Sequence, residues 1–293
     1  MPFWIWLILG FVLLSFLGMF AATWPIAKKV YHNILVRTGP EKWTRANSYP
    51  PNPEHTRMFD LGMDWARENE ARKRPVFIEN EGLKLAGEYF DFGHKRCAII
   101  FPGRTESLYY SYYFAQPYAE AGCNILVVDS RAHGLSEGKY NYCSTREWSD
   151  VIAWSRFAHD QLGCSDVVLH GICVGGAAVV LAAAKPDFPA YVSHLVVEGL
   201  FATFLESFKL HMKAEKRPIF PVLYEIFWAA RLESGMKIRE DAFSLPKRAE
   251  ALYAACNAPK ELVWMDEGSH SHLRINNQEL YDGSIKAFLQ KTF

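Results

Sequence analysis

Short apolar runs that alternate with helical stretches constrain the fold of this chain more than any other feature. Runs of this kind are typical of strands buried on both faces of a parallel sheet. The first two, PVFIEN and LKLAGEYF, predict a hairpin that turns at Glu81-Gly82. The later runs are CAIIFPG (97–103), NILVVDS (124–130), DVVLHGI (166–172), HLVVEGL (194–200) and KELVWMDEG (260–268). Strand alternating with helix predicts an α/β sheet with right-handed crossovers.

The loops that follow four of these strands carry glycines and polar side chains, and ligands bind at this edge of such a sheet. The loops read FPGRTES, DSRAHGLSEGKY, HGICVGG and DEGSHSHL. In this order they resemble the motifs of the α/β-hydrolase superfamily, over roughly residues 75–293. The second is similar to the family's D-x-R-G-H-G-x-S-x-G loop, with Ala132 at one glycine. The resemblance implies the α/β-hydrolase fold, a mostly parallel sheet with a helical lid at about residues 201–245.

HGICVGG matches the nucleophile elbow G-x-S-x-G, with Cys173 in place of serine. The elbow holds its central residue in a strained turn, and the glycines at Gly171 and Gly175 avoid clashes there. The N-terminus of the following helix is expected to lower the thiol pKa. The backbone N–H of Val174 is the first expected oxyanion donor, and by resemblance that of Arg104 is the second. Dienelactone hydrolases use G-x-C-x-G within this fold, and the resemblance to them is confined to the elbow.

The resemblance also implies a general base. His270 follows the last predicted strand, where the family carries its histidine, and His272 competes with it two residues later. The H-x-H pair has no third ligand, so no metal site is expected. His133 and His170 match motif positions that usually have structural roles.

The sequence leaves three alternatives for the acid that would orient His270. The family normally ends an apolar strand with an aspartate before the last strand, but here the segment MKI is too thin for a buried strand. One late strand is therefore expected to be lost or very short. Glu198 ends the strand beside the elbow strand, and some members of the family place the acid there. Asp241 has the usual spacing ahead of His270, but no strand positions it; a Cys-His pair without an acid is the third alternative.

The N-terminal stretch is uncharged from Phe3 to Trp24. About 20 helical residues at ~1.5 Å each cross the ~30 Å hydrocarbon core of a membrane. Interfacial tryptophans lie near its two ends: Trp4, Trp6 and Trp24. A signal peptide would begin with basic residues, but here they all follow the run: Lys28, Lys29 and Arg37. The sequence predicts a single-pass anchor with the following domain in the cytoplasm.

These patterns divide the chain into an anchor (1–27), a polar, partly helical connector (28–74) and a hydrolase domain (75–293). SYPPNP, residues 48–53, breaks any helix in the connector. DLGMDWARENEARKR then predicts a short surface helix.

Composition excludes several classes of function. Lysine plus arginine equals aspartate plus glutamate, 32 each, so no general attraction to nucleic acid is expected. The sequence has no Walker loop and no G-x-G-x-x-G, and no cofactor is expected. Six cysteines without C-x-x-C spacing argue against zinc and against a disulfide framework, and they favour a reducing compartment.

The predicted function is hydrolysis of an ester or thioester, with Cys173 as nucleophile, His270 as general base and a carboxylate orienting the histidine. Residues 201–233 are rich in aromatic side chains with interspersed lysines. Such a lid near a membrane anchor suits a small apolar ester or acyl substrate, although the same residues could simply pack the lid onto the sheet. The alternative is a catalytically silent member of the fold that binds a ligand or partner through the same pocket, because serine is replaced and a strand is eroded.

Overall fold

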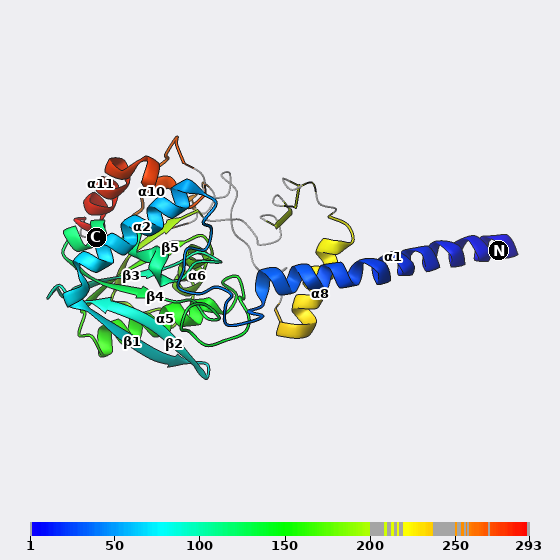
Figure 1. Ribbon diagram of the computed structural model, residues 1–293, viewed down its shortest axis with the longest axis horizontal. Helices are drawn as coiled ribbons and strands as arrows, with labels where there is room; N and C mark the ends of the chain where they lie inside the picture. The colour runs from blue at the N-terminus through cyan, green and yellow to red at the C-terminus, as the bar shows by residue number, and fades with distance from the viewer. Residues whose placement is uncertain are drawn as a thin grey trace.

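The computed structural model has a body of sheet and helices, with one long N-terminal helix projecting from it (Figure 1). It describes residues 2–199, 208–209, 212–213, 216, 219–236, 250, 253–254, 256, 258–268 and 270–291.

Six strands form one sheet in the order β1-β2-β4-β3-β5-β6. Their bounds are β1 Lys73–Asn80, β2 Leu83–Phe90, β3 Arg96–Phe101, β4 Cys123–Val128, β5 Asp166–Ile172 and β6 Val192–Glu198. β2 is antiparallel to β1 and to β4, and the other neighbours are parallel. The predicted hairpin is confirmed, with Glu81 and Gly82 both at positive φ in its turn. The mostly parallel α/β sheet is confirmed as well.

The last predicted strand is wrong. Residues 260–268 form no strand, and their large apolar side chains are exposed: Leu262 by 40%, Val263 by 41% and Trp264 by 55%. A strand needs a neighbour to satisfy its backbone N–H and C=O groups. β6 is the edge of the sheet, and among the described residues that follow it no segment pairs with it. The apolar run at 260–268 therefore stays unpaired, and β6 keeps an edge with no described neighbour.

Helices cover both faces of the sheet. On one face lie α2 Pro53–Glu68, α3 Leu108–Ser111, α4 Gln116–Glu120 and α11 Gln278–Leu289, and on the other lie α5 Glu147–Asp160 and α6 Val174–Ala183. Short helical turns complete these layers: η1 Glu70–Arg72, η2 Tyr112–Phe114 and α10 Leu273–Asn276. Each face buries its own apolar cluster, with Met58, Ile100 and Tyr281 in the first and Ile99 and Trp154 in the second.

The connector helix α2 spans Pro53–Glu68 instead of the predicted residues 60–74, the last two of which belong to β1, and it is more buried than a surface helix would be. α2 begins at Pro53, directly after the predicted break, and the Asn52 side chain caps it by accepting a hydrogen bond from the His55 N–H at 3.0 Å. Met58 is fully buried against the sheet layer. The helix is therefore part of the core rather than a surface element.

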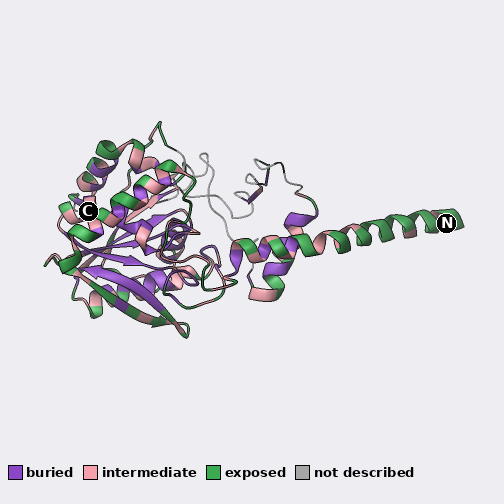
Figure 2. Ribbon diagram, in the orientation of Figure 1, coloured by how far each residue is buried: buried purple, intermediate pink, exposed green. Residues whose placement is uncertain are grey.

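The N-terminal helix α1 runs from Phe3 to Leu35 without a break. It is the one helix in the described part of the chain that is long and apolar enough to cross a membrane, with a mean hydropathy of 2.4 over a window of which nothing is buried. Figure 2 shows its outer part exposed. Ala27, Tyr31 and Leu35, near its other end, are buried in a third apolar cluster with α8 Val222–Ser234.

The connector attaches this helix to the sheet through buried polar contacts. Arg45 donates from Nε to Asp129 at 2.9 Å and from Nη1 to Glu88 at 2.7 Å. Trp43 stacks on His133 with ring centroids 4.5 Å apart. The residues between α1 and β1 therefore belong to the folded domain.

Candidate active site

The elbow holds Cys173 between β5 and α6. The backbone φ of Cys173 is 53°, in the left-handed region that residues other than glycine rarely adopt. A Cβ on Gly171 would lie 2.4 Å from the Gly176 Cα, and one on Gly175 would lie 2.4 Å from the Phe101 carbonyl oxygen. Only glycine permits these two approaches. The Cys173 N–H donates to the backbone oxygen of Glu198 at 3.0 Å, which ties the elbow to the end of β6.

Two backbone N–H groups are directed at the Cys173 sulfur, those of Val174 and Arg104, and both favour its thiolate. The Arg104 carbonyl oxygen accepts a hydrogen bond from the Asn141 amide at 3.0 Å, and His133 Nε2 lies 2.6 Å from the same oxygen. His133 thus supports the loop that presents the Arg104 N–H. The N–H groups of Val174 and Arg104, the two that the sequence singles out, therefore both lie at the Cys173 sulfur.

The electrostatic environment of the thiol differs from the expectation. Burial, followed by the carboxyl of Glu106, raises the pKa of Cys173 to about 12. The Arg104 guanidinium and the two N–H groups oppose this rise without outweighing it. The expectation of a thiol with a lowered pKa is therefore wrong, because desolvation of the charged form exceeds the effect of the helix N-terminus. At neutral pH the thiol is protonated, and attack by sulfur needs a base.

Two buried carboxyl groups lie near this thiol. Glu198 ends β6, and burial raises its pKa to about 7 against the opposing effects of the Tyr281 hydroxyl and Arg274. Burial also raises the pKa of Glu106 to about 7, and Glu198 adds to the rise. Glu106 Oε2 accepts a hydrogen bond from the Gly103 N–H at 2.9 Å. Carboxyls with pKa values near neutrality can take up and release protons at physiological pH.

Sequence reasoning missed Glu106. It is the only carboxylate in the FPGRTES loop, and this loop follows β3, the strand that pairs with the elbow strand β5. A carboxylate at the carboxyl end of a strand next to the elbow strand was the available signal.

His270 lies at the end of β6 although the strand predicted before it is absent. Its ring packs on Gly199, where an added Cβ would lie 2.9 Å from the ring's Cε1. Gly199 directly follows Glu198, so the histidine and the carboxylate come from the same corner of the sheet. Asp241, the other acid expected from the sequence, lies outside the described residues.

His272 turns towards α2 instead. It is buried, its Nδ1 lies 3.8 Å from the Glu54 carboxylate, and its ring meets the His55 ring edge to face. His170 is also buried, with its Nε2 3.3 Å from the Tyr281 hydroxyl. Within the described ranges, no group of three or more His, Cys, Asp or Glu side chains is arranged to hold a metal ion.

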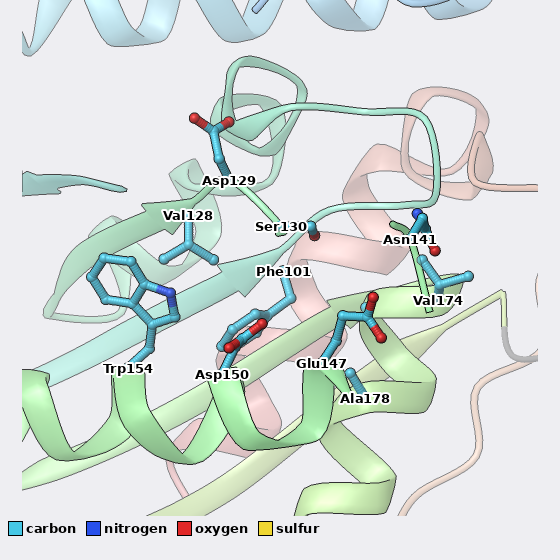
Figure 3. Close-up of a pocket in the computed structure, with 11 residues that line it drawn as sticks. Phe101, Val128, Asp129, Ser130, Asn141, Glu147, Asp150, Trp154, Val174 and Ala178 are labelled. Carbon is cyan, nitrogen blue, oxygen red and sulfur yellow. The ribbon is translucent and has the colours of Figure 1, made fainter. Parts of the chain in front are cut away.

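A small cavity of about 20 Å³ lies behind the elbow (Figure 3). A space of this size holds about one water molecule. It is lined by Phe101, Val128, Asp129, Ser130, Asn141, Glu147, Asp150, Trp154, Val174, Gly175 and Ala178. Cys173 is absent from the lining and packs with the apolar cluster on the other face of the sheet. This cavity is therefore separate from the nucleophile.

The strand order, the elbow and the loops define the class: the chain has the α/β-hydrolase fold. Residues 99–220 match the family model described as alpha/beta hydrolase fold. The chain is 23% identical to the uncharacterized protein YqkD of Bacillus subtilis over 216 residues, which are 65% of this chain and 70% of that protein.

Solved structures show the same fold. The esterase Pf2001 of Pyrococcus furiosus superposes with a TM-score of 0.60 at 20% identity, over 77% of this chain and 93% of that one. An alpha-beta hydrolase of Vibrio vulnificus superposes with a TM-score of 0.53 at 14% identity, over 86% of this chain and 99% of that one.

Proposed function

We propose that this protein hydrolyses carboxylic ester or thioester bonds through a Cys173 acyl-enzyme. The observation that carries the proposal is the elbow, which holds Cys173 at a φ of 53° with the N–H groups of Val174 and Arg104 directed at its sulfur. Donors in this position stabilise the oxyanion of a tetrahedral intermediate. The likeness in fold to an enzyme described as an esterase supports the same class of reaction.

The reaction needs a base because the resting thiol is protonated. In the proposed mechanism, His270 takes the thiol proton as the sulfur forms a bond with the substrate carbonyl carbon. The carbonyl oxygen becomes the oxyanion and accepts the Val174 and Arg104 N–H groups. The intermediate collapses to a thioester on Cys173, and the leaving alcohol or thiol takes the proton from His270. Water activated by His270 then releases the acid and restores the thiol.

Glu198 is the proposed partner of His270. Its place at the end of β6, one residue before the glycine on which the His270 ring packs, supports this role. The carboxylate would orient the imidazole and stabilise its protonated form. Asp241 stays the alternative.

The proposed setting is a membrane surface. α1 would cross the membrane with its outer apolar part, and the basic residues after it favour a cytoplasmic catalytic domain. The exposure of this apolar part and the packing of Ala27 and Tyr31 against α8 support an anchor that is retained in the mature protein. A small apolar ester or acyl substrate suits this location.

Two observations favour a second candidate function, a catalytically silent protein that binds a ligand or partner at the same pocket. The thiol pKa is raised to about 12, so the resting nucleophile is weak. The absence of a strand at residues 260–268 leaves the His270 loop without the support that this fold usually gives it.

A paired hydrolysis assay separates the two. The full-length protein in detergent is given series of p-nitrophenyl esters and acyl thioesters of increasing chain length. We expect turnover that is lost in Cys173→Ala and strongly reduced in His270→Ala, while His272→Ala, the matched histidine control, keeps most of it. Absence of turnover by the wild-type protein on both series, together with saturable binding of an acyl ligand, would favour the silent protein.

A further inference from the structure

α8, a helix of the lid region, packs against the inner half of α1 and crosses it obliquely (Figure 1). Three contacts fix its position along α1. The Phe220 ring, just before α8, lies 6.0 Å from the ring of Phe16 and 5.8 Å from that of Phe20, measured between centroids. Thr23 Oγ1 donates to the Glu225 carboxylate at 2.9 Å. Further along, Glu233 pairs with Lys28 at 3.0 Å and with His32 at 2.7 Å. The two helices therefore run in the same direction.

These contacts give α8 a depth in the membrane that α1 is proposed to cross. The apolar span ends near Trp24, and Phe16 and Phe20 precede it by roughly 6–12 Å along the helix axis. Phe220 is then level with the hydrocarbon region. Glu233, paired with residues after Trp24, is level with the aqueous side. α8 passes from one level to the other along its own length.

The outward face of α8 suits this position. Phe220, Trp228 and Leu232 are exposed by 52%, 62% and 69%. Tyr224, Trp228 and Leu232 recur every four residues and so lie on one face of α8. Phe220 directly precedes the helix, and Arg231 is exposed beside this face. Aromatic, apolar and basic side chains in this arrangement are typical of helices that lie in the membrane interface. Glu225 is buried against α1 and hidden from lipid.

We propose that α8 is itself a membrane-contacting element, with the face formed by Phe220, Tyr224, Trp228 and Leu232 embedded in the leaflet that borders the catalytic domain. The inference rests on the proposed anchor and adds a second contact with the same bilayer. Continuity with the exposed apolar surface of α1, through the Phe16–Phe220–Phe20 ring contacts, identifies the lipid bilayer as the occupant of this face.

This contact holds the candidate active site at the membrane-facing end of the domain. The Arg104 guanidinium, on the loop that supplies the second oxyanion donor, donates to the Ile34 carbonyl oxygen at 3.4 Å near the end of α1. Arg37 donates to the Gly134 and Ser136 carbonyl oxygens at 3.0 Å and 3.2 Å. Substrate carried in the bilayer would therefore meet α8 and the oxyanion loop on the same side of the domain.

Depth-dependent fluorescence tests the proposal. Single cysteines are introduced by Trp228→Cys and Leu232→Cys on α8, Leu14→Cys on the outer part of α1, and Leu280→Cys, an exposed leucine on α11. The background is Cys173→Ala with Cys256→Ser, since the remaining four cysteines are buried. Each full-length variant is labelled with NBD and placed in phosphatidylcholine–phosphatidylglycerol vesicles with or without doxyl-labelled lipid.

We expect blue-shifted emission and quenching by doxyl lipid at positions 14, 228 and 232, and neither effect at 280. Quenching at 14 with none at 228 and 232 would overturn the contact of α8 while leaving the anchor in place. Absence of quenching at position 14 would contradict both the proposed anchor and the proposed contact of α8 with the membrane. A blue shift at 228 and 232 without quenching would mean that protein, such as a second copy of this chain, covers the face, and would also overturn the proposal.

Discussion

At the scale of single residues, the environment of Cys173 is set by burial rather than by the helix dipole. Its thiol is buried against apolar side chains and lies near the Glu106 carboxyl, whose own pKa is raised to about 7. A nucleophile in such a site resembles a serine in its need for a base. The proposed chemistry therefore depends on His270 and on the carboxylate that orients it.

Glu198→Gln should lower kcat by a factor on the order of 10³ or more, because a neutral amide neither fixes the imidazole tautomer nor stabilises the imidazolium. Asp241→Asn is the matched carboxylate control and should be nearly neutral. Steady-state kinetics on one ester substrate measures both. The reverse pattern would assign the acid to Asp241, and two neutral outcomes in an active enzyme would mean a Cys-His pair.

The raised pKa of Glu198 also predicts how the stability of the protein depends on pH. The unfolded carboxyl titrates near 4.5 and the folded one near 7, so the folded state holds its proton longer as the pH rises. Stability is then lost between about pH 4.5 and 7, by up to about 3 kcal/mol per carboxyl. Glu198→Gln should remove this loss and be more stable than wild type at pH 8, as measured by urea unfolding at pH 4 and pH 8. The exposed Glu41→Gln should follow the wild-type profile, and so would Glu198→Gln if the buried carboxyl were not titrating.

At the scale of elements, the chain shows where apolar patterning predicts structure and where it does not. The runs at 97–103, 124–130 and 166–172 became β3, β4 and β5 because each has a neighbour on both sides. The run at 260–268 has a similar composition and forms no strand, because pairing depends on a partner that local sequence does not reveal. The elbow was predictable because its glycine pattern lies within one short segment of the sequence, whereas the raised pKa of Glu106 and its effect on Cys173 depend on burial in the folded domain.

The connector was predicted to lie outside the domain, yet Arg45 pairs with two buried carboxylates. Arg45→Ala should destabilise the protein by about 3 kcal/mol, because it removes the cation that pairs with buried Asp129, which then keeps only the Leu108 and Leu135 N–H groups, and weakens the pairing of Glu88, which keeps Lys73. Arg156→Ala, which removes an exposed pair with Asp187, should cost no more than about 1 kcal/mol. Urea unfolding in detergent compares them. If both variants lowered the free energy of unfolding by the same small amount, residues 28–74 would be a linker and not part of the folded domain.

At the scale of the whole molecule, a long apolar helix, the proposed membrane anchor, is joined to an α/β-hydrolase fold. The full-length protein should sediment with membranes and resist carbonate extraction, while deletion of residues 1–27 should release it into the soluble fraction. Protease added outside intact cells should spare the catalytic domain, as the basic residues after the span require. Cleavage of the domain from outside would reverse the orientation and leave the anchor standing. If carbonate released the intact chain from membranes, the proposal that α1 is a membrane anchor would be wrong.

The most direct test of the central claim is detection of the acyl-enzyme. The full-length protein is mixed with a p-nitrophenyl ester, quenched in acid within the first turnovers and analysed by intact-protein and peptide mass spectrometry. The account predicts a mass increase equal to one acyl group on the peptide containing Cys173, absent from Cys173→Ala, and formed more slowly in His270→Ala. Ester turnover without an acyl group on Cys173, or an acyl group that persists in Cys173→Ala, would contradict it.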